Sequence, residues 1–192
     1  MESREYGDKM FEELMYAKVV AVQLVNWLGY DVLFQDVDVV WLHKNPLDAV
    51  LKLYPSFDLL IQNDGDRTLR YAPFFANLGF CLVRFSEHTR HFLVRMLHLA
   101  DTIVRSAKHE QALNLLLSEH ASLYGLRSKT VSMDDFPGGF HFHHNHEFMR
   151  DVIAQKRTPC MFHMSWTNNK LLKIKFLQQM KLFGRTACIV SL

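Results

Sequence analysis

The sequence predicts an α/β fold in which helices flank a mixed, mostly parallel sheet. Helical stretches alternate along the chain with short apolar runs that lack an apolar–polar alternation, and such runs are typical of strands buried on both faces. The 192 residues suit one domain, and no internal repeat, low-complexity tract or linker divides them. We therefore expect residues 1–192 to form a single layered domain.

The elements follow from periodicity and from capping residues. Apolar residues at three- and four-residue steps predict a first helix from Met10 to Leu28, and Gly29 directly after it is a typical helix stop. Further helices are expected over residues 45–53, from Ser86 past Val104, over 110–117 and over 171–182. Strands are expected over 30–34, 58–61 and 79–85 and around Met161.

Composition narrows the class of protein. Hydrophobic residues make up 49% of the chain, including 15 Phe, which is enough for a core and excludes intrinsic disorder. Twenty-two basic residues nearly balance twenty acidic ones without a basic stripe, so we expect no nucleic-acid partner. No run reaches the ~18 apolar residues of a membrane helix. The polar start, MESREYGDKM, resembles neither a secretory signal nor a transit peptide, so no membrane anchor is visible.

The three cysteines give no disulfide framework. Cys81, Cys160 and Cys188 are far apart and odd in number. We expect three free, buried thiols, although one disulfide stays open if the compartment is oxidising.

An acidic turn follows the first predicted strand. Asp36 and Asp38 stand where the strand ends, and ligands of open α/β sheets bind beyond the carboxyl ends of strands. Residues two apart in an extended chain point the same way, so both carboxylates can face one hard cation. The flanking apolar residues would make unpaired charges costly, which favours a divalent metal. The alternative is a solvated turn, or carboxylates that cap a neighbouring helix.

The residues around this turn occur in a specific order. A helical lysine and a glycine precede the strand, and the Asp pair, a tryptophan and a proline follow it. These residues are Lys18, Gly29, Asp36, Asp38, Trp41 and Pro46. The motifs NLGFCLVR (77–84), EQALN (110–114), FPGGFHF (136–142) and PCMFHMSWTNNK (159–170) follow in order. Together, over about residues 16–179, they resemble the nucleotide-diphospho-sugar transferase domain, which includes retaining glycosyltransferases.

The resemblance implies a GT-A type, Rossmann-like fold and a specific reaction. A sugar would pass from a nucleotide diphosphate donor, most readily a UDP-sugar, to a glycan or glycoprotein acceptor. Mn²⁺ or Mg²⁺ would serve as cofactor, and the anomeric configuration would be retained. The family typically works in the secretory pathway, so the resemblance alone implies the Golgi lumen.

The resemblance also assigns metal and phosphate ligands. Asp36 and Asp38 become ligands of the metal and the donor, and His163 becomes a further metal ligand, since Mn²⁺ accepts imidazole as well as carboxylate. Lys170 would neutralise the diphosphate. On local grounds alone, His163 could equally be a core histidine and Lys170 a solvated helix start.

The remaining assignments concern the sugar. Asn77, Gly79, Asn114, Trp166 and Lys18 are implied to bind the donor, with Asn amides able to donate to and accept from hydroxyls. A simple turn would also explain NLGF. Glu110 and Gln111 open a predicted helix and are expected to face the reacting centre, where the family usually shows Asp before Gln. Whether transfer proceeds by double displacement or on the front face stays open.

A histidine-rich segment, HFHHNH, lies between two of the motifs. It contains His141, His143, His144 and His146 but lacks a cysteine or carboxylate at zinc-ligand spacing. In an extended chain, His141 and His143 would share a face. It is interpreted as an acceptor-side or surface loop, with a second metal site as the alternative.

Two rival functions remain. A haloacid-dehalogenase phosphatase also has an Asp pair after a strand, and Asp134 and Asp135 could form its distal acidic pair. The second rival is a non-catalytic remnant. GT-A folds normally begin with a strand and helix that bind the nucleotide base, whereas this chain begins at the following helix, so we expect an N-terminally truncated fold.

Overall fold

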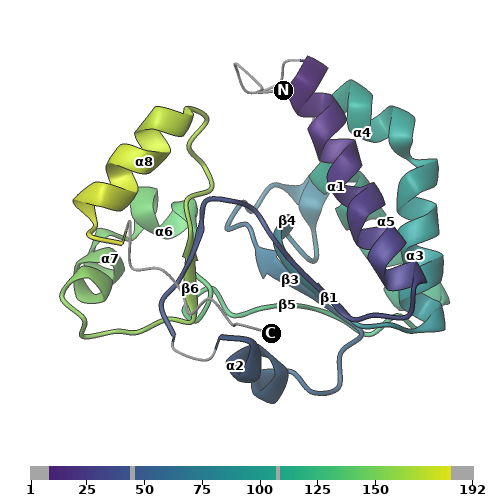
Figure 1. The fold of residues 1–192 in the computed structure, drawn as a ribbon, viewed down its shortest axis with the longest axis horizontal. Helices are drawn as coiled ribbons and strands as arrows, with labels where there is room; N and C mark the ends of the chain where they lie inside the picture. The colour runs from purple at the N-terminus through teal and green to yellow at the C-terminus, as the bar shows by residue number, and fades with distance from the viewer. Residues whose placement is uncertain (1–8, 44–45, 107–108, 183–192) are drawn as a thin grey trace. The chain divides into compact units, whose positions relative to one another are not determined.

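The computed structural model describes residues 9–43, 46–106 and 109–182 (Figure 1). Their contacts divide the chain into two compact units. The first unit comprises Met1–Gln35 and Ser56–Thr130, and the second comprises Asp36–Pro55 and Val131–Leu192. The expected single domain stays a prediction.

Within the described part of the chain, the first unit has a four-stranded mixed sheet. Its strands, in order across the sheet, are β1 (Val32–Gln35), β4 (Ala76–Val83), β3 (Leu59–Asn63) and β5 (Ser128–Thr130). Three strands run in one direction and β4 is reversed, so β3 and β5 form the parallel pair while β4 is antiparallel to β1 and β3. The reversal arises because β4 follows β3 through a loop that contains the short helix η1 (Leu69–Tyr71), without a crossover helix. The expected mixed α/β architecture is confirmed, but the sheet is less parallel than expected, because two of its three strand pairs are antiparallel.

Helices α1 (Lys9–Trp27), α3 (Glu87–His98), α4 (Ala100–Ser106) and α5 (His109–Leu123) lie together in this unit (Figure 1). Their core contains Val19 and Val22 of α1, packed with Phe92, Met96 and Leu113. The apolar stripe that predicted α1 is largely exposed instead, with Leu14 at 45% and Leu24 at 57%. Periodicity thus identified the helix but not the face that it buries.

The long helix expected from Ser86 past Val104 is wrong in one respect, because the structure breaks it at Leu99. The N–H of Leu99 donates to the carbonyls of Leu97 and Met96, which tightens the last turn, and α4 then starts at Ala100. Ser86 does cap α3 through a capping box with Thr89. The side chain of Val104 lies outside the described residues.

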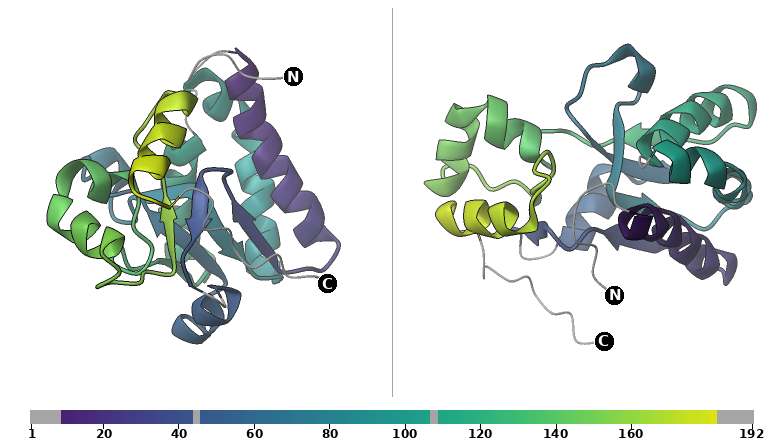
Figure 2. Two further views of the ribbon diagram at one scale, coloured as in Figure 1. Left: turned by 60° about the vertical axis from the view of Figure 1, so that its left-hand side comes forward. Right: turned by 90° about the horizontal axis from the view of Figure 1, so that it is seen from above.

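The described residues of the second unit form two strands and four helices. Strand β2 (Val39–Trp41) pairs with β6 (Met161–His163) in antiparallel register, with Val39 opposite His163. The helices are α2 (Pro46–Leu53), α6 (Gly139–His144), α7 (His146–Ile153) and α8 (Lys170–Gln179). Helices α6 to α8, coloured green to yellow, lie next to one another in both views of Figure 2. Their core includes Phe148, Phe162 and Leu177.

Two further sequence expectations can be compared with the described residues. Cys81 and Cys160 are free and buried as expected, and Cys188 lies outside the described residues. Asn45, the expected cap of α2, also lies outside them. Among the described helices, none combines the length and the apolar character that crossing a membrane requires.

Candidate metal centre

Two carboxylates and an imidazole converge in the second unit. Asp36, Asp38 and His163 each offer one ligand atom, and these three atoms lie within 4.8 Å of one another. The chain reverses between the two acids, because the N–H of Val39 donates to the carbonyl of Asp36 at 3.2 Å and Val37 projects fully into solvent. A turn, and not the expected extended segment, therefore brings the carboxylates together.

Strand pairing fixes the position of His163. It is the last residue of β6, its N–H donates to the carbonyl of Pro137 at 3.1 Å, and its side chain is only 4% exposed. The N–H of the next residue, Met164, donates to the carbonyl of Asp38 at 3.1 Å. The β2–β6 pair thus holds the imidazole beside the acidic turn.

Asp38 is a buried carboxylate with two basic neighbours. Its side chain is 12% exposed, His163 Nε2 lies 3.4 Å from Oδ1, and Lys173 Nζ donates to Oδ2 at 2.6 Å. Burial by itself raises the pKa of Asp38. The hydrogen bonds and charges of His163 and Lys173 outweigh burial and hold this pKa well below its ordinary value. Asp38 is therefore ionised at neutral pH, as a metal ligand must be.

Lys173 is the residue of this site that sequence reasoning missed. The sequence pointed to Lys170, which the structure places at the exposed first position of α8. Lys173 lies nearly one turn further and contacts Asp38. The available signal was the three-residue spacing between the two lysines, which puts them on neighbouring parts of one helix face.

The donor set fits a divalent cation. Two carboxylates and one imidazole are the ligand types that a borderline ion such as Mn²⁺ accepts. Two neighbouring carboxylates also need compensating positive charge. In this structure Lys173 supplies one positive charge, at Asp38. Among the described residues, no other group of three or more His, Cys, Asp or Glu side chains meets the same criterion.

Two motifs meet beside this centre. A Cβ on Gly139 would lie 1.8 Å from the carbonyl oxygen of Ser165, so only glycine allows this approach. The N–H of Gly139 donates to Ser165 Oγ at 3.0 Å. FPGGFHF and the segment after His163 are therefore packed backbone against backbone.

The histidine segment is helical, so the expected alternation of His141 and His143 is wrong. Helix α6 ends at His144, and His146 starts α7. His141 is buried, which lowers its pKa, and its Nε2 lies 3.8 Å from Asp134 Oδ1. His143 Nε2 is 3.3 Å from Thr167 Oγ1. Asp134, one acid of the phosphatase alternative, thus lies beside His141.

The predicted sugar-binding residues belong to the first unit, apart from Trp166. The Asn77 amide donates to Asp64 Oδ1 at 2.7 Å, and its oxygen accepts the N–H of Gly79 at 2.6 Å. Lys18 Nζ lies 5.3 Å from the centre of the Phe34 ring, beside a pocket whose other lining residues are apolar. The donor-binding roles of these residues stay predictions.

Helix α5 carries the remaining predicted residues. Glu110 is half-buried and Gln111 is exposed in its first turn. The Asn114 side chain is buried and clamps Ala76 of β4, accepting its N–H at 2.9 Å and donating to its carbonyl at 3.0 Å. Asn114 therefore supports a strand, a role that the sequence pattern did not indicate.

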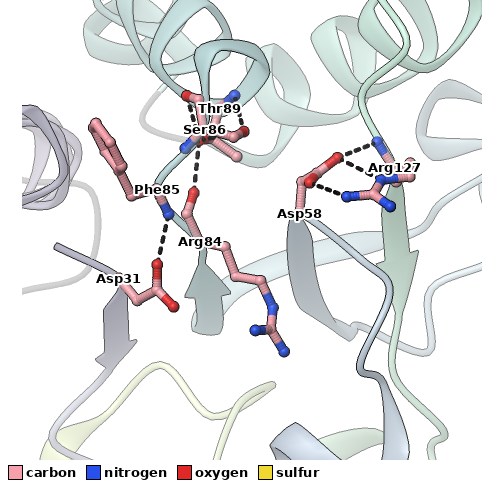
Figure 3. Close-up of polar contacts among 7 residues, drawn as sticks. All are labelled: Asp31, Asp58, Arg84, Phe85, Ser86, Thr89 and Arg127. Atoms are coloured by element: carbon pink, nitrogen blue, oxygen red, sulfur yellow. Dashed lines mark hydrogen bonds and ion pairs between the residues drawn. The ribbon is translucent and has the colours of Figure 1, made fainter. Parts of the chain in front are cut away.

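A second buried acid, Asp58, was also not anticipated (Figure 3). Arg127 donates to it through Nη2 at 2.7 Å, Nε at 3.0 Å and its backbone N–H at 3.1 Å. These hydrogen bonds, chiefly that of the Arg127 side chain, lower the pKa of Asp58 although burial opposes them. Nearby, Asp31 accepts the N–H of Phe85 at 2.7 Å. This network joins strand ends of the first unit.

Comparison with known proteins identifies the family. Residues 2–177 match the family model of nucleotide-diphospho-sugar transferases. Neither the curated proteins nor the solved structures contain a significant match. The matched region spans most of the chain and includes the acidic turn, His163 and all of the motifs named above. The chain therefore belongs to the nucleotide-diphospho-sugar transferase family, and this membership supports glycosyl transfer as its general class of reaction.

Proposed function

We propose that the chain is a metal-dependent glycosyltransferase that uses a UDP-sugar, retains the anomeric configuration and modifies a glycan or glycoprotein. The observation that carries this proposal is the convergence of Asp36, Asp38 and His163 within 4.8 Å. Retention, the UDP donor, the acceptor class and a Golgi compartment rest on the resemblance of the motifs to the family.

The reaction explains why such a site is needed. As the bond between the sugar C1 and the phosphate oxygen breaks, the diphosphate gains negative charge. When bound, Mn²⁺ or Mg²⁺ would act as a Lewis acid that stabilises this negative charge. Asp36, Asp38 and His163 would hold the ion, with Asp38 already ionised.

Lys173 would provide a second positive charge. Its ammonium group pairs with Asp38 in the structure, and the Lys173 side chain is 28% exposed, so it is accessible to ligands from solvent. An ammonium on a flexible stem suits a diphosphate oxygen as a point charge. We assign the diphosphate contact to Lys173 and keep Lys170, at the exposed start of α8, as an auxiliary residue.

The sugar contacts are proposed from the family motifs. Asn77, Gly79 and Asn114 would lie toward the donor, with Glu110 and Gln111 toward the reacting centre. Since Asn114 already bonds both backbone groups of Ala76, its contribution would be to position β4.

Calorimetric titration with UDP, with and without Mn²⁺, tests this function. We expect binding that requires Mn²⁺ and that weakens at least 100-fold in Asp38→Ala. Asp134→Ala is the matched control, because this exposed acid of the same unit lies outside the proposed site and should leave UDP affinity unchanged. No binding of UDP by the folded wild-type chain would contradict an independent transferase and favour the non-catalytic remnant.

A phosphatase would behave differently. It would trap phosphate on Asp36 during turnover, and loss of Asp134 would impair it. Mass spectrometry after incubation with a phosphate ester therefore separates the two activities: an unmodified Asp36 is expected for a transferase.

A further inference from the structure

Helices α3 and α5 lie side by side in the first unit and bring three histidines close together (Figure 1). His88 and His91 lie one turn apart on α3, and His120 lies in the last turn of α5. The ring centres of His91 and His120 are 5.1 Å apart, and the rings are tilted by 39°. The ring centre of Tyr124 lies 4.8 Å from that of His91 and 4.9 Å from that of His120. We call His88, His91 and His120 the histidine cluster.

His120 is the buried member of the cluster, with none of its surface exposed. Its Nδ1 lies 3.0 Å from the carbonyl oxygen of Leu116, one turn earlier on the same helix. A carbonyl oxygen can only accept, so Nδ1 carries the proton of this hydrogen bond. Burial lowers the pKa of His120 despite this bond, so the ring is neutral at pH 7 and Nε2 keeps its lone pair.

Nε2 of His120 is a buried acceptor. Among the residues that the structure describes, it has no hydrogen-bond partner, and a buried polar atom without a partner is costly. A hydrogen bond from Nδ1 to a backbone carbonyl is also the arrangement that orients metal-binding histidines, because it fixes the tautomer and leaves Nε2 for the ion. The local structure of α5 therefore prepares His120 to bind a cation through Nε2.

The spacing of the two rings matches that around one tetrahedral ion. A bound imidazole nitrogen lies about 2.0–2.1 Å from Zn²⁺, which places the centres of two imidazoles on one ion about 5 Å apart. The observed separation of His91 and His120 is 5.1 Å. The side chain of His91 is exposed, so an ion from solvent can reach the pair.

His88 can supply a third imidazole. It is exposed in the first turn of α3, and its Nε2 lies 3.8 Å from the position that a Cβ on Gly125 would take. Gly125 follows Tyr124, whose ring borders the other two histidines. The three imidazoles do not present nitrogens within 4.8 Å of one another in the structure, so the exposed His88 side chain would rotate to complete the site.

We propose that the histidine cluster is a second metal site, which binds Zn²⁺ or a similar borderline divalent cation. Imidazole nitrogens suit such ions, whereas the hard cations Mg²⁺ and Ca²⁺ prefer oxygen ligands. The charge of the neighbouring Arg95 is offset by Glu119, whose carboxylate lies 3.9 Å from the guanidinium. The ion would join α3 to α5 and so stabilise the first unit. This role does not depend on the proposed function.

The test measures Zn²⁺ binding by calorimetry without nucleotide. All proteins carry Asp38→Asn, which removes the acidic centre of the second unit, so a failure of the proposed function leaves the result unaffected. His91→Ala removes the exposed imidazole of the pair, and we expect the affinity for one Zn²⁺ to fall at least 10-fold. His98→Ala, at an exposed position of the same helix, is the matched control and should leave the affinity unchanged. Circular dichroism checks that each variant is folded.

Nitrogen-15 NMR of the imidazoles locates the ion. We expect Zn²⁺ to shift the Nε2 resonance of His120, and the same Zn²⁺ concentration to shift it less in His91→Ala. Equal Zn²⁺ affinities in His91→Ala and His98→Ala, or an unshifted His120 Nε2, would overturn the proposal. Zn²⁺ bound by the histidine segment of the second unit would instead shift His143 and His144 and leave His120 unshifted, which also overturns it.

His88→Ala tests the third ligand. We expect it to weaken Zn²⁺ binding less than His91→Ala does, because the structure places His88 further from the pair. An affinity unchanged in His88→Ala would overturn the assignment of His88 as a ligand.

Discussion

Each of the two units contains a buried aspartate with basic partners, but the partners differ in kind. Asp58 of the first unit meets a planar guanidinium through both oxygens and also accepts a backbone N–H. Asp38 of the second unit meets an ammonium through one oxygen and lies 3.4 Å from an imidazole through the other. Both carboxyls have lowered pKa values, so the pKa alone does not distinguish them.

The arrangement of partners does distinguish them. The fork on Asp58 occupies a fixed plane and joins Asp58 to the start of β5, which suits a scaffold. The partners of Asp38 are single-atom contacts beside a second carboxylate, Asp36, and a metal-competent histidine. Asp38 can therefore exchange its ammonium partner for a metal cation without the loss of a two-atom guanidinium contact.

The largest effect that this comparison predicts is on metal-dependent donor binding. Replacing His163 by Ala removes the imidazole ligand, and we expect the affinity for UDP in the presence of Mn²⁺ to fall about 100-fold, equivalent to about 2.7 kcal/mol. Calorimetry measures the change. His143→Ala, from the histidine segment, is the control. Equal losses in both variants would show that His163 acts only through folding.

The next effect concerns the scaffold. Asn114→Ala leaves the buried N–H and carbonyl of Ala76 without their side-chain partner, which costs about 1–3 kcal/mol. For a chain of this size we expect a melting temperature several degrees lower, measured by calorimetry or circular dichroism. Leu115→Ala, at an exposed position of the same helix, should change it little. If the melting temperature of Asn114→Ala is unchanged while UDP-sugar affinity falls, Asn114 is a donor contact.

The third prediction concerns Lys173, the single-atom partner of Asp38, in contrast to the two-atom guanidinium partner of Asp58. We expect Lys173→Ala to weaken UDP binding about 10-fold, because the diphosphate loses one cationic contact, while Mn²⁺ alone binds at least as tightly as before. Lys175→Ala is exposed on the same helix and should have no effect. A larger effect for Lys170→Ala than for Lys173→Ala would return the diphosphate role to Lys170.

The smallest effect is on acid stability. The pKa of Asp58 is lowered by folding, so near and below its ordinary value the unfolded chain binds more protons than the folded one. The stabilisation from this group is therefore complete above the ordinary value and is lost as pH falls through the lower folded value. Urea unfolding measured between about pH 2.5 and 6 should show that the free energy of unfolding falls less steeply with decreasing pH in Asp58→Asn than in wild type. If the free energy of unfolding falls equally steeply in both proteins, Asp58 does not contribute to the pH dependence of stability.

Much of the architecture could be predicted from the sequence because it depends on local patterns. Apolar runs located the larger strands, and Ser86 and Gly29 marked helix ends. Strands β2 and β5 were missed for physical reasons: β2 is three residues long directly after the acidic turn, and β5 is a short polar segment that pairs only on one side. The exposed stripe of α1 shows that burial depends on tertiary partners that periodicity does not specify.

The candidate site was predictable where residue type carries the chemistry. Asp36, Asp38 and His163 are metal-ligand types at positions that the motifs fix. Lys173 could not be inferred in the same way, since a lysine on a polar helix has many possible partners and only the fold brings it to Asp38. The backbone clamp of Asn114 likewise depends on where β4 runs.

The claim that three side chains of the second unit hold a divalent cation can be measured most directly by electron paramagnetic resonance of Mn²⁺. Mn²⁺ is added to the wild-type chain and to Asp38→Asn in the absence of nucleotide, and the spectra give the amounts of free and bound ion. We predict one bound Mn²⁺ per wild-type chain and a loss of that binding in the folded variant. Equal Mn²⁺ binding by the two proteins would contradict the site.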